Sequence, residues 1–244
     1  MTGESTPLPA GRRPPLAVRA LRLLWRLATD RPYRNVMYAF WFRPKAVFQP
    51  FNDTRAERYP VIFGLVQSRL GKDSAVRILS FGCSTGEEVV TLRRYFPHAF
   101  IKGIDVNPGN IAVCNRRARL SGDTRLAFET ASSTAAEPSA AYDAIFCMAV
   151  LRHGAVGAAG VTRCDHLIRF EDFAATVAEF DRCLKPGGLL AIAHSNFRFG
   201  DTPTAAAFTP LMSRPPGPNT PLFGPDNARL EPAERVDVVF GKRR

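Results

Sequence analysis

Between residues 76 and 240 the chain alternates short apolar runs with segments in which apolar residues recur every three or four positions. Continuous apolar runs of this length are typical of buried strands, and the longer period is typical of helices with one buried face. The pattern predicts strands over 76–81, 99–106, 125–130, 142–150, 189–194 and 236–240, and helices over 87–95, 110–120 and 171–184. Such alternation favours an α/β fold in which helices cover both faces of a parallel sheet.

The N-terminal quarter of the chain has a different pattern. Residues 1–15 are polar and rich in proline, which predicts a disordered tail. Residues 16–28 predict an amphipathic helix, with Arg19, Arg22 and Arg26 on one face and leucines with Trp25 on the other.

Two further features complete this region. The segment 33–51 is rich in aromatic residues and predicts an ordered collar, with 49–59 closing an acceptor pocket. Thr54 and Glu57 have the spacing of a capping box, which predicts a second helix ending near Leu70. We therefore expect a helical N-terminal extension over 16–74, ahead of a domain over 75–244.

The segment before the last predicted strand is rich in proline, and the sequence assigns it to a long loop. Loops of this length inside a compact domain are usually functional. We expect residues 197–222 to act as a lid over the site.

The formal charge of +11 is concentrated near the N-terminus. Residues 1–45 carry nine basic and two acidic side chains, a net charge of +7. This asymmetry is compatible with binding to nucleic acid or to an anionic membrane through residues 1–45, or simply with a basic soluble protein.

The cysteines and the hydropathy pattern bear on location. Five cysteines without a CxxC pair predict buried, reduced thiols and no metal site, as expected of a cytoplasmic protein. The run Cys164-Asp165-His166 does not have the spacing of a tetrahedral zinc site. No apolar run approaches the roughly 20 residues that span a bilayer.

The strongest local motif lies at the end of the first predicted strand, where Gly82-Cys-Ser-Thr-Gly86 precedes a helix. Glycines suit a turn at which a ligand approaches the backbone. A dinucleotide site is the main alternative, since such a loop places pyrophosphate at a helix N-terminus. Glu87 and Glu88 occupy that first turn and would repel a diphosphate, so we favour a phosphate-free, cationic ligand.

An acidic residue follows the next strand. Asp105 lies 19 residues after Gly86, at the end of the second predicted strand of the domain. A carboxylate there is placed to accept hydrogen bonds from both hydroxyls of a ribose. This arrangement supports an adenosine ligand.

These motifs together resemble those of the class I S-adenosylmethionine-dependent methyltransferases over about residues 75–241. The resemblance also includes Tyr142-Asp-Ala-Ile-Phe-Cys-Met148 and Leu184-Lys-Pro-Gly-Gly-Leu-Leu190. It implies a Rossmann-like, doubly wound, seven-stranded and mostly parallel sheet, and S-adenosyl-L-methionine as cofactor. The cofactor-binding residues implied are Gly82, Cys83, Ser84, Thr85, Gly86, Asp105, Val106, Ser132, Cys147 and Met148.

A narrower similarity exists to the chemotaxis-receptor (CheR-type) glutamate methyltransferases. It rests on the run from Gly82 to Glu88, on the segment 143–151 and on His194-Ser195. The chain departs from that pattern at 148–149 and at Asn196, so a related enzyme with a different acceptor is the better interpretation.

His153 and His194 follow the fourth and fifth strands of this pattern and are the candidate catalytic bases. A carboxylate acceptor would need no base. The sequence thus predicts a methyltransferase acting on a small molecule or a carboxylate. The alternative is a noncatalytic adenosine-cofactor-binding module that docks on nucleic acid or membrane through its basic N-terminal arm.

Overall fold

The computed structural model describes residues 15–30, 33–34, 37, 48–49, 57–71, 75–157, 160–217 and 220–244. Its strands are β1 (Arg77–Phe81), β2 (Phe100–Asp105), β3 (Leu126–Thr130), β4 (Tyr142–Met148), β5 (Leu184–Ala193), β6 (Phe208–Arg214) and β7 (Val236–Lys242). Its α-helices are α1 (Leu16–Thr29), α3 (Pro60–Leu70), α4 (Glu87–Tyr95), α5 (Pro108–Ser121) and α6 (Phe170–Cys183). Short 3₁₀ helices are η2 (Gly154–Gly157), η3 (Phe199–Asp201) and η4 (Pro203–Ala207).

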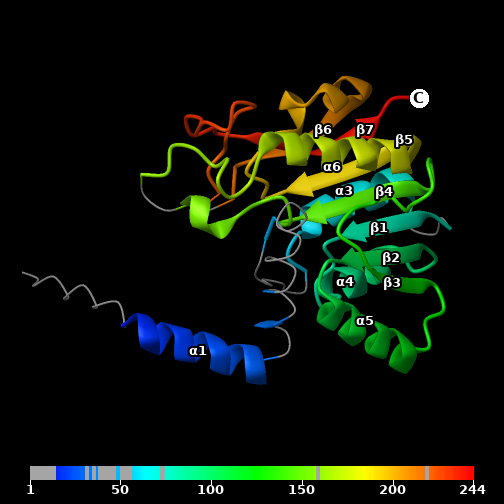
Figure 1. The fold of residues 1–244 in the computed structure, drawn as a ribbon. Coiled ribbons are helices and arrows are strands. Elements are labelled where there is room, and N and C mark those ends of the chain that lie inside the picture. The colour runs from blue at the N-terminus through cyan, green and yellow to red at the C-terminus, as the bar shows by residue number, and fades with distance from the viewer. Residues whose placement is uncertain are drawn as a thin grey trace, which may run out of the picture.

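The seven strands form one sheet in the order β3-β2-β1-β4-β5-β7-β6 (Figure 1). Neighbouring strands from β3 to β5 are parallel, and β7 runs antiparallel to both β5 and β6. β2 and β3 lie on one side of β1, and β4 and β5 lie on the other, so the strand order reverses between β1 and β4. Ligands of such sheets bind at the carboxyl ends of the strands beside this point. The predicted α/β class and the seven-stranded, mostly parallel sheet are confirmed.

Two apolar cores lie on the two faces of the sheet. On one face, α6 packs Phe173, Val177 and Phe180 against β1, β4 and β5. On the other face, α3, α4 and α5 contribute residues such as Phe63 and Leu92, both at most 1% exposed. Each such side chain contributes about 1.5–3 kcal/mol through burial, which holds the strands rigidly beneath the loops.

Residues 208–214, which the sequence assigns to the lid loop, instead form β6. β6 pairs only with β7, so it is an edge strand. An edge strand tolerates Pro210, whereas a proline within an apolar run reads as a loop in sequence.

Two smaller boundaries also differ from the prediction. The expected turn at 186–188 lies within β5, where the pairing with β4 passes from Leu184 opposite Tyr142 to Leu189 opposite Ala144. The second helix begins at Pro60, where proline is favoured, and not at the predicted capping box. Glu57 lies in a turn before that helix, and Thr54 falls outside the described residues.

The N-terminal extension is described only in part. It includes α1, which Figure 1 shows lying away from the sheet, and α3, which packs on the domain. The tail at 1–14 and most of the collar fall outside the described residues, so the predicted extension remains a prediction as a unit. Among the described helices, none has the length and apolarity needed to cross a membrane. All five cysteines are buried free thiols, as the sequence predicts.

Candidate functional site

The glycine loop between β1 and α4 folds back onto the end of β2. The backbone N–H groups of Gly82 and Cys83 both donate to the carbonyl of Ile104, at 2.8 and 3.0 Å. Gly82 has φ of +73°, and a Cβ there would lie 2.4 Å from a methyl of Val150 in the loop after β4. Only glycine fits this turn, because both the backbone conformation and the close packing exclude a side chain.

Asp105 joins the loop after β2 to the glycine loop. Its Oδ2 accepts a hydrogen bond from the Ser84 N–H at 2.8 Å, and its Oδ1 accepts from the Asn107 N–H and the Asn110 side chain. Burial raises the pKa of Asp105, against the effect of these donors. A carboxylate has about four acceptor sites, and these donors occupy three of them. About one site is left for a ligand hydroxyl, whereas bidentate binding of a ribose would need two.

Two buried polar atoms beside Asp105 have no hydrogen-bond partner within the described residues. They are the hydroxyl Oγ of Ser84 and the amide Nδ2 of Asn107, one on each loop. A buried polar group without a partner costs about 1–3 kcal/mol, and such groups in native proteins usually await a ligand or water. The pair therefore fits a polar ligand held between the two loops. Asn107 was missed by the motif analysis, since its Oδ1 also serves as an ordinary cap of α5.

The two glutamates at the start of α4 have different environments. Burial acts to raise the pKa of Glu87, but hydrogen bonds from Thr85 and Arg117 outweigh burial and lower this pKa. Glu88 accepts a hydrogen bond from the Ser80 hydroxyl at 2.7 Å, and burial raises the pKa of Glu88 to about 7. The two carboxylates therefore present less free negative charge than the sequence argument against a diphosphate assumed. Glu87 stays charged but is paired with Arg117, so the argument against a diphosphate is weaker than the sequence alone suggests.

Backbone strain gathers at the carboxyl edge of the sheet. Ser84, Ala149 and His194 have φ between +51° and +60° and lie one to three residues after the ends of β1, β4 and β5. Non-glycine residues rarely adopt this conformation, and such strain tends to cluster at ligand and catalytic sites. The three positions mark adjacent strands of the sheet.

The loops after β4 and β5 are held together by Asn196, which is fully buried. Its Oδ1 accepts from the His153 N–H, its Nδ2 donates to the Pro221 carbonyl, and both bonds measure 2.8 Å. Its own N–H donates to Leu151, and its carbonyl accepts from Phe223. Asn196 thereby connects both strand ends to the end of the predicted lid at Pro221 and to Phe223 just after it, a role that no local motif signals.

The two candidate histidines differ in their surroundings. His153 is 9% exposed, and its Nδ1 accepts a hydrogen bond from the Ala155 N–H at 3.3 Å. Burial, together with the nearby His166, lowers the pKa of His153. His194 follows β5, its ring lies 5.6 Å from the ring of Tyr59, and a Cβ on Gly217 would overlap it. His194 is therefore flanked by Tyr59, the residue before α3, and by Gly217 of the predicted lid.

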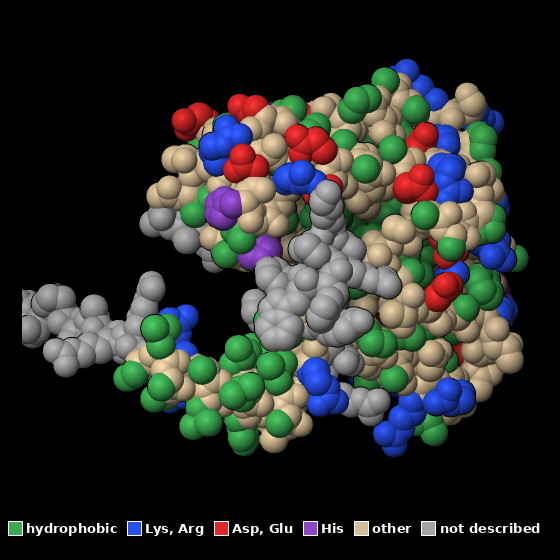
Figure 2. All heavy atoms as spheres, in the orientation of Figure 1, with side chains coloured by type: hydrophobic (Ala, Val, Ile, Leu, Met, Phe, Trp, Pro, Cys, Tyr) green, Lys and Arg blue, Asp and Glu red, His purple; other side chains and the backbone are tan. Residues whose placement is uncertain are grey.

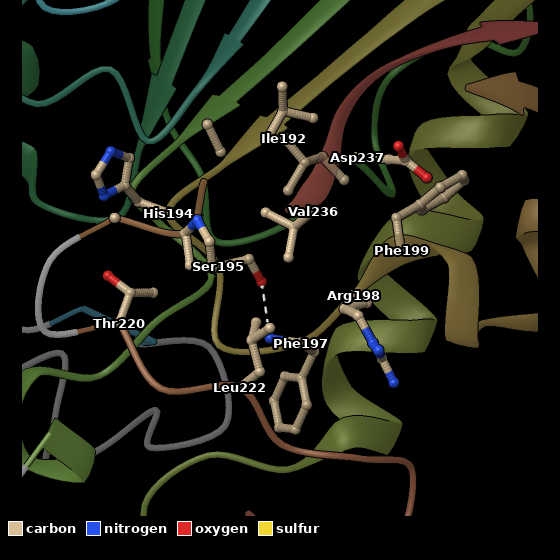
Figure 3. Close-up of a pocket in the computed structure, with 14 residues that line it drawn as sticks. Ile192, His194, Ser195, Phe197, Arg198, Phe199, Thr220, Leu222, Val236 and Asp237 are labelled. Carbon is tan, nitrogen blue, oxygen red and sulfur yellow. Dashed lines mark hydrogen bonds between the residues drawn. The ribbon is translucent and has the colours of Figure 1, made fainter. Parts of the chain in front are cut away.

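A cleft opens beside His194 between the end of β5 and the start of β7 (Figure 3). It has a volume of about 370 Å³, including open solvent. Figure 3 shows His194 and Thr220 at one end of the lining residues and Phe199 and Asp237 at the other. Part of the predicted lid lines this cleft, namely Pro216, Gly217, Thr220 and Leu222.

The remaining predicted cofactor residues lie at the same edge of the sheet. Cys147 and Met148 end β4 and are buried, and Val106 follows β2 and is half-buried. Ser132 follows β3 in a bend, where the Ala131 N–H donates to the Asp105 carbonyl. Parallel pairing of β1, β2, β3 and β4 thus gathers all ten predicted cofactor residues along one edge.

The segment that carries this site matches a known protein family. Residues 72–214, more than half of the chain, match the family model described as "Methyltransferase domain". The chain belongs to the methyltransferase domain family. The predicted resemblance to methyltransferases is confirmed at this level. Neither this match nor the relatives below bear on the narrower chemotaxis-type similarity, which remains a prediction.

Curated relatives match parts of this methyltransferase domain. The ubiquinone biosynthesis O-methyltransferase of Leptothrix cholodnii is 28% identical over 53% of each protein. The trans-aconitate 2-methyltransferase of Methylobacterium nodulans is 29% identical over 51% of this chain and 40% of its own length. The chain thus spans about half or less of the length of these relatives. Among solved structures, the [4+2]-cyclase SpnF aligns with a TM-score of 0.48 and 25% identity, over 69% of this chain and 65% of that one.

Proposed function

We propose that this chain is an S-adenosylmethionine-dependent methyltransferase that acts on a small-molecule acceptor. The observation that carries the proposal is the unpartnered Ser84 hydroxyl, buried in the glycine loop beside Asp105 in a methyltransferase domain. A loop with two glycines in the left-handed region and one free polar atom is suited to a ligand that approaches the backbone closely.

In this proposal Gly82, Cys83, Ser84, Thr85 and Gly86 hold the methionine part of the cofactor. Asp105 offers its remaining acceptor site to the ribose, with Val106 and Ser132 beside the adenosine. Cys147 and Met148 form the apolar floor. When bound, the cofactor supplies an activated methyl group, and the chain contributes alignment and exclusion of water.

The acceptor is assigned to the cleft beside His194. Its lining is mostly apolar, and its polar and charged side chains come from the residues after β5, from the lid and from the start of β7 (His194, Ser195, Arg198, Thr220 and Asp237). His194 is the better placed of the two candidate bases, because it lines this cleft and the His153 imidazole is engaged with its own loop. The names of the two curated relatives support a small-molecule acceptor, and neither comparison supports the noncatalytic alternative.

Calorimetric titration with S-adenosylhomocysteine tests the cofactor assignment. Replacing Asp105 by Asn removes a charge-assisted contact, which is worth about 1.5–3 kcal/mol, so we expect affinity to fall about 10–100-fold. Asp143→Asn is the matched control. That carboxylate also accepts a backbone N–H, from Arg77 at 2.8 Å, but it lies at the opposite edge of the sheet.

The control is expected to bind S-adenosylhomocysteine within about twofold of the parent. Melting temperatures of all three proteins separate a lost contact from a damaged fold. Equal affinity in the parent and in the folded Asp105→Asn protein would remove Asp105 from the site. Binding of a nicotinamide or flavin dinucleotide in place of S-adenosylhomocysteine would overturn the proposal.

A further inference from the structure

The helix α1 carries an unusual concentration of exposed apolar side chains. Five of the nine large hydrophobic residues exposed in the described chain lie on these 14 residues, and no residue of α1 is buried. Leu16, Leu21, Leu24 and Trp25 are each at least 63% exposed. Figure 2 shows hydrophobic side chains crowding the surface of this helix, which Figure 1 places away from the sheet.

A helix of this length is only marginally stable alone in water. Other exposed apolar residues of the domain, such as Val61 and Leu120, occur singly or nearly so on α3, α4 and α5 and need no explanation. The apolar face of α1 therefore calls for a surface that covers it.

The two faces of α1 identify that surface. At 100° per residue, Arg19, Arg22 and Arg26 fall within an arc of about 60°, and the apolar residues occupy an arc of about 220°. The helix contains no acidic residue, and residues 1–45 have a net charge of +7. A broad apolar face with tryptophan beside a narrow cationic stripe is the arrangement of helices that lie in a lipid interface.

Nucleic acid would use the arginines alone and leave the broad apolar arc in water. A second copy of the chain would cover the apolar arc, but it would bring like-charged segments together. We propose that α1 binds the surface of an anionic lipid bilayer, with its leucines and Trp25 at the acyl boundary and its arginines at the lipid phosphates. This surface is separate from the proposed methyltransferase site and does not rest on it.

The test uses the full chain with Trp41→Phe, which leaves Trp25 as the one tryptophan. Vesicles of phosphatidylcholine, alone or with about one quarter phosphatidylglycerol, are added while Trp25 emission and co-sedimentation are measured. We expect a blue shift of Trp25 and binding that depends on the anionic lipid. Leu21→Glu with Leu24→Glu should abolish both signals.

Replacing Arg19, Arg22 and Arg26 by Gln should weaken binding about 100-fold, since each charge near such a surface contributes about fivefold. Leu120→Glu is the matched control for the leucine changes, because Leu120 is 79% exposed, compared with 69% for Leu21 and 63% for Leu24, but it lies at the end of α5. This control should bind as the parent does. Affinity for S-adenosylhomocysteine should be unchanged in every variant.

Three results would overturn the proposal. Vesicle binding that survives the Leu21 and Leu24 changes would place the membrane contact elsewhere. A mass in solution that doubles without lipid and halves in the same variant would assign the apolar face to a second copy. Binding to duplex DNA or RNA that depends on the arginines, with no binding to anionic vesicles, would assign the helix to nucleic acid.

Discussion

The two halves of the candidate site are held together in different ways. In the half that follows β1 and β2, the glycine loop and the Asp105 loop bond directly to each other through Ile104 and Ser84. In the half that follows β4 and β5, Asn196 connects both strand ends to residues 221–223, about 25 positions further along the chain. The first half is therefore built from contacts between neighbouring loops, and the second depends on a distant segment.

The different construction of the two halves suits them to different ligands. The first half is suited to a ligand of fixed shape, because its glycine turns and buried carboxylate permit little adjustment. The second half takes part of its lining from Pro216, Gly217, Thr220 and Leu222, which take no part in the hydrogen bonds between the two loops of the first half. A methyltransferase needs such a division if one cofactor is to serve many acceptors.

The largest effect should come from breaking the first half at Gly82. In Gly82→Ala the new Cβ would meet Val150 at 2.4 Å in a left-handed backbone conformation. Overpacking and backbone strain together cost about 2–5 kcal/mol, so we expect a large loss of unfolding free energy, measured by urea denaturation. S-adenosylhomocysteine binding should fall with it.

Val150→Ala provides the matched control. Alone it should cost about 1 kcal/mol, and combined with Gly82→Ala it should recover the steric part of the loss but not the part due to φ. If the double variant is no more stable than Gly82→Ala, the contact between Gly82 and Val150 does not limit this turn.

The next effect concerns the second half. Asn196→Ala would remove the partners of the buried His153 N–H and of the part-buried Pro221 carbonyl, at a cost of about 2–4 kcal/mol. Hydrogen exchange should quicken at the amides of His153 and Phe223, while S-adenosylhomocysteine affinity stays near that of the parent. That combination would show that the two halves are separable.

Asn227→Ala is the control for burial of an asparagine. Asn227 is 6% exposed, and its Oδ1 accepts from the Phe170 N–H at 2.7 Å, at the start of α6. It should lose similar stability without faster exchange at His153. Loss of cofactor affinity in Asn196→Ala alone would mean that the halves are coupled, contrary to our comparison.

The same division explains what the sequence could predict. Gly82, Gly86 and Asp105 belong to motifs whose spacing follows from strand length and turn geometry, so their joint location was predictable. The contact from Asn196 to Pro221 depends on how a proline-rich segment returns to the sheet, and no periodic pattern encodes that path. β6 was missed because Pro210 interrupts it, although an edge strand accommodates proline.

Within the first half, the sequence also predicted residues without their roles. Glu88 was recognised as an acid at a helix N-terminus, where it was expected to remain charged. Its contact with Ser80 depends on how α4 packs on β1, which residue spacing does not specify. Because burial raises the pKa of Glu88 to about 7, the charge at this position depends on pH near neutrality.

The smallest predicted effect tests that titration. The pKa of Glu88 is raised from 4.5 to about 7, so between these pH values the folded state holds a proton that the unfolded state has lost. Stability from this group therefore falls as pH rises across the window, by about 2 kcal/mol after allowance for partial exposure. In Glu88→Gln, which keeps an acceptor for Ser80, that slope should disappear.

Other groups titrate in the same window, so the difference between parent and variant is the quantity to measure. The lowered pKa of His153, in the other half of the site, acts with the opposite sign, because the unfolded state binds the proton more tightly and stability rises with pH. Glu87→Gln is the matched control, since the pKa of Glu87 is lowered and its contribution is lost only as pH falls through the acid range. A difference between parent and Glu88→Gln that stays constant from pH 4.5 to 7 would mean that Glu88 is solvated and charged throughout, and the first half of the site would then carry the negative field that its sequence suggests.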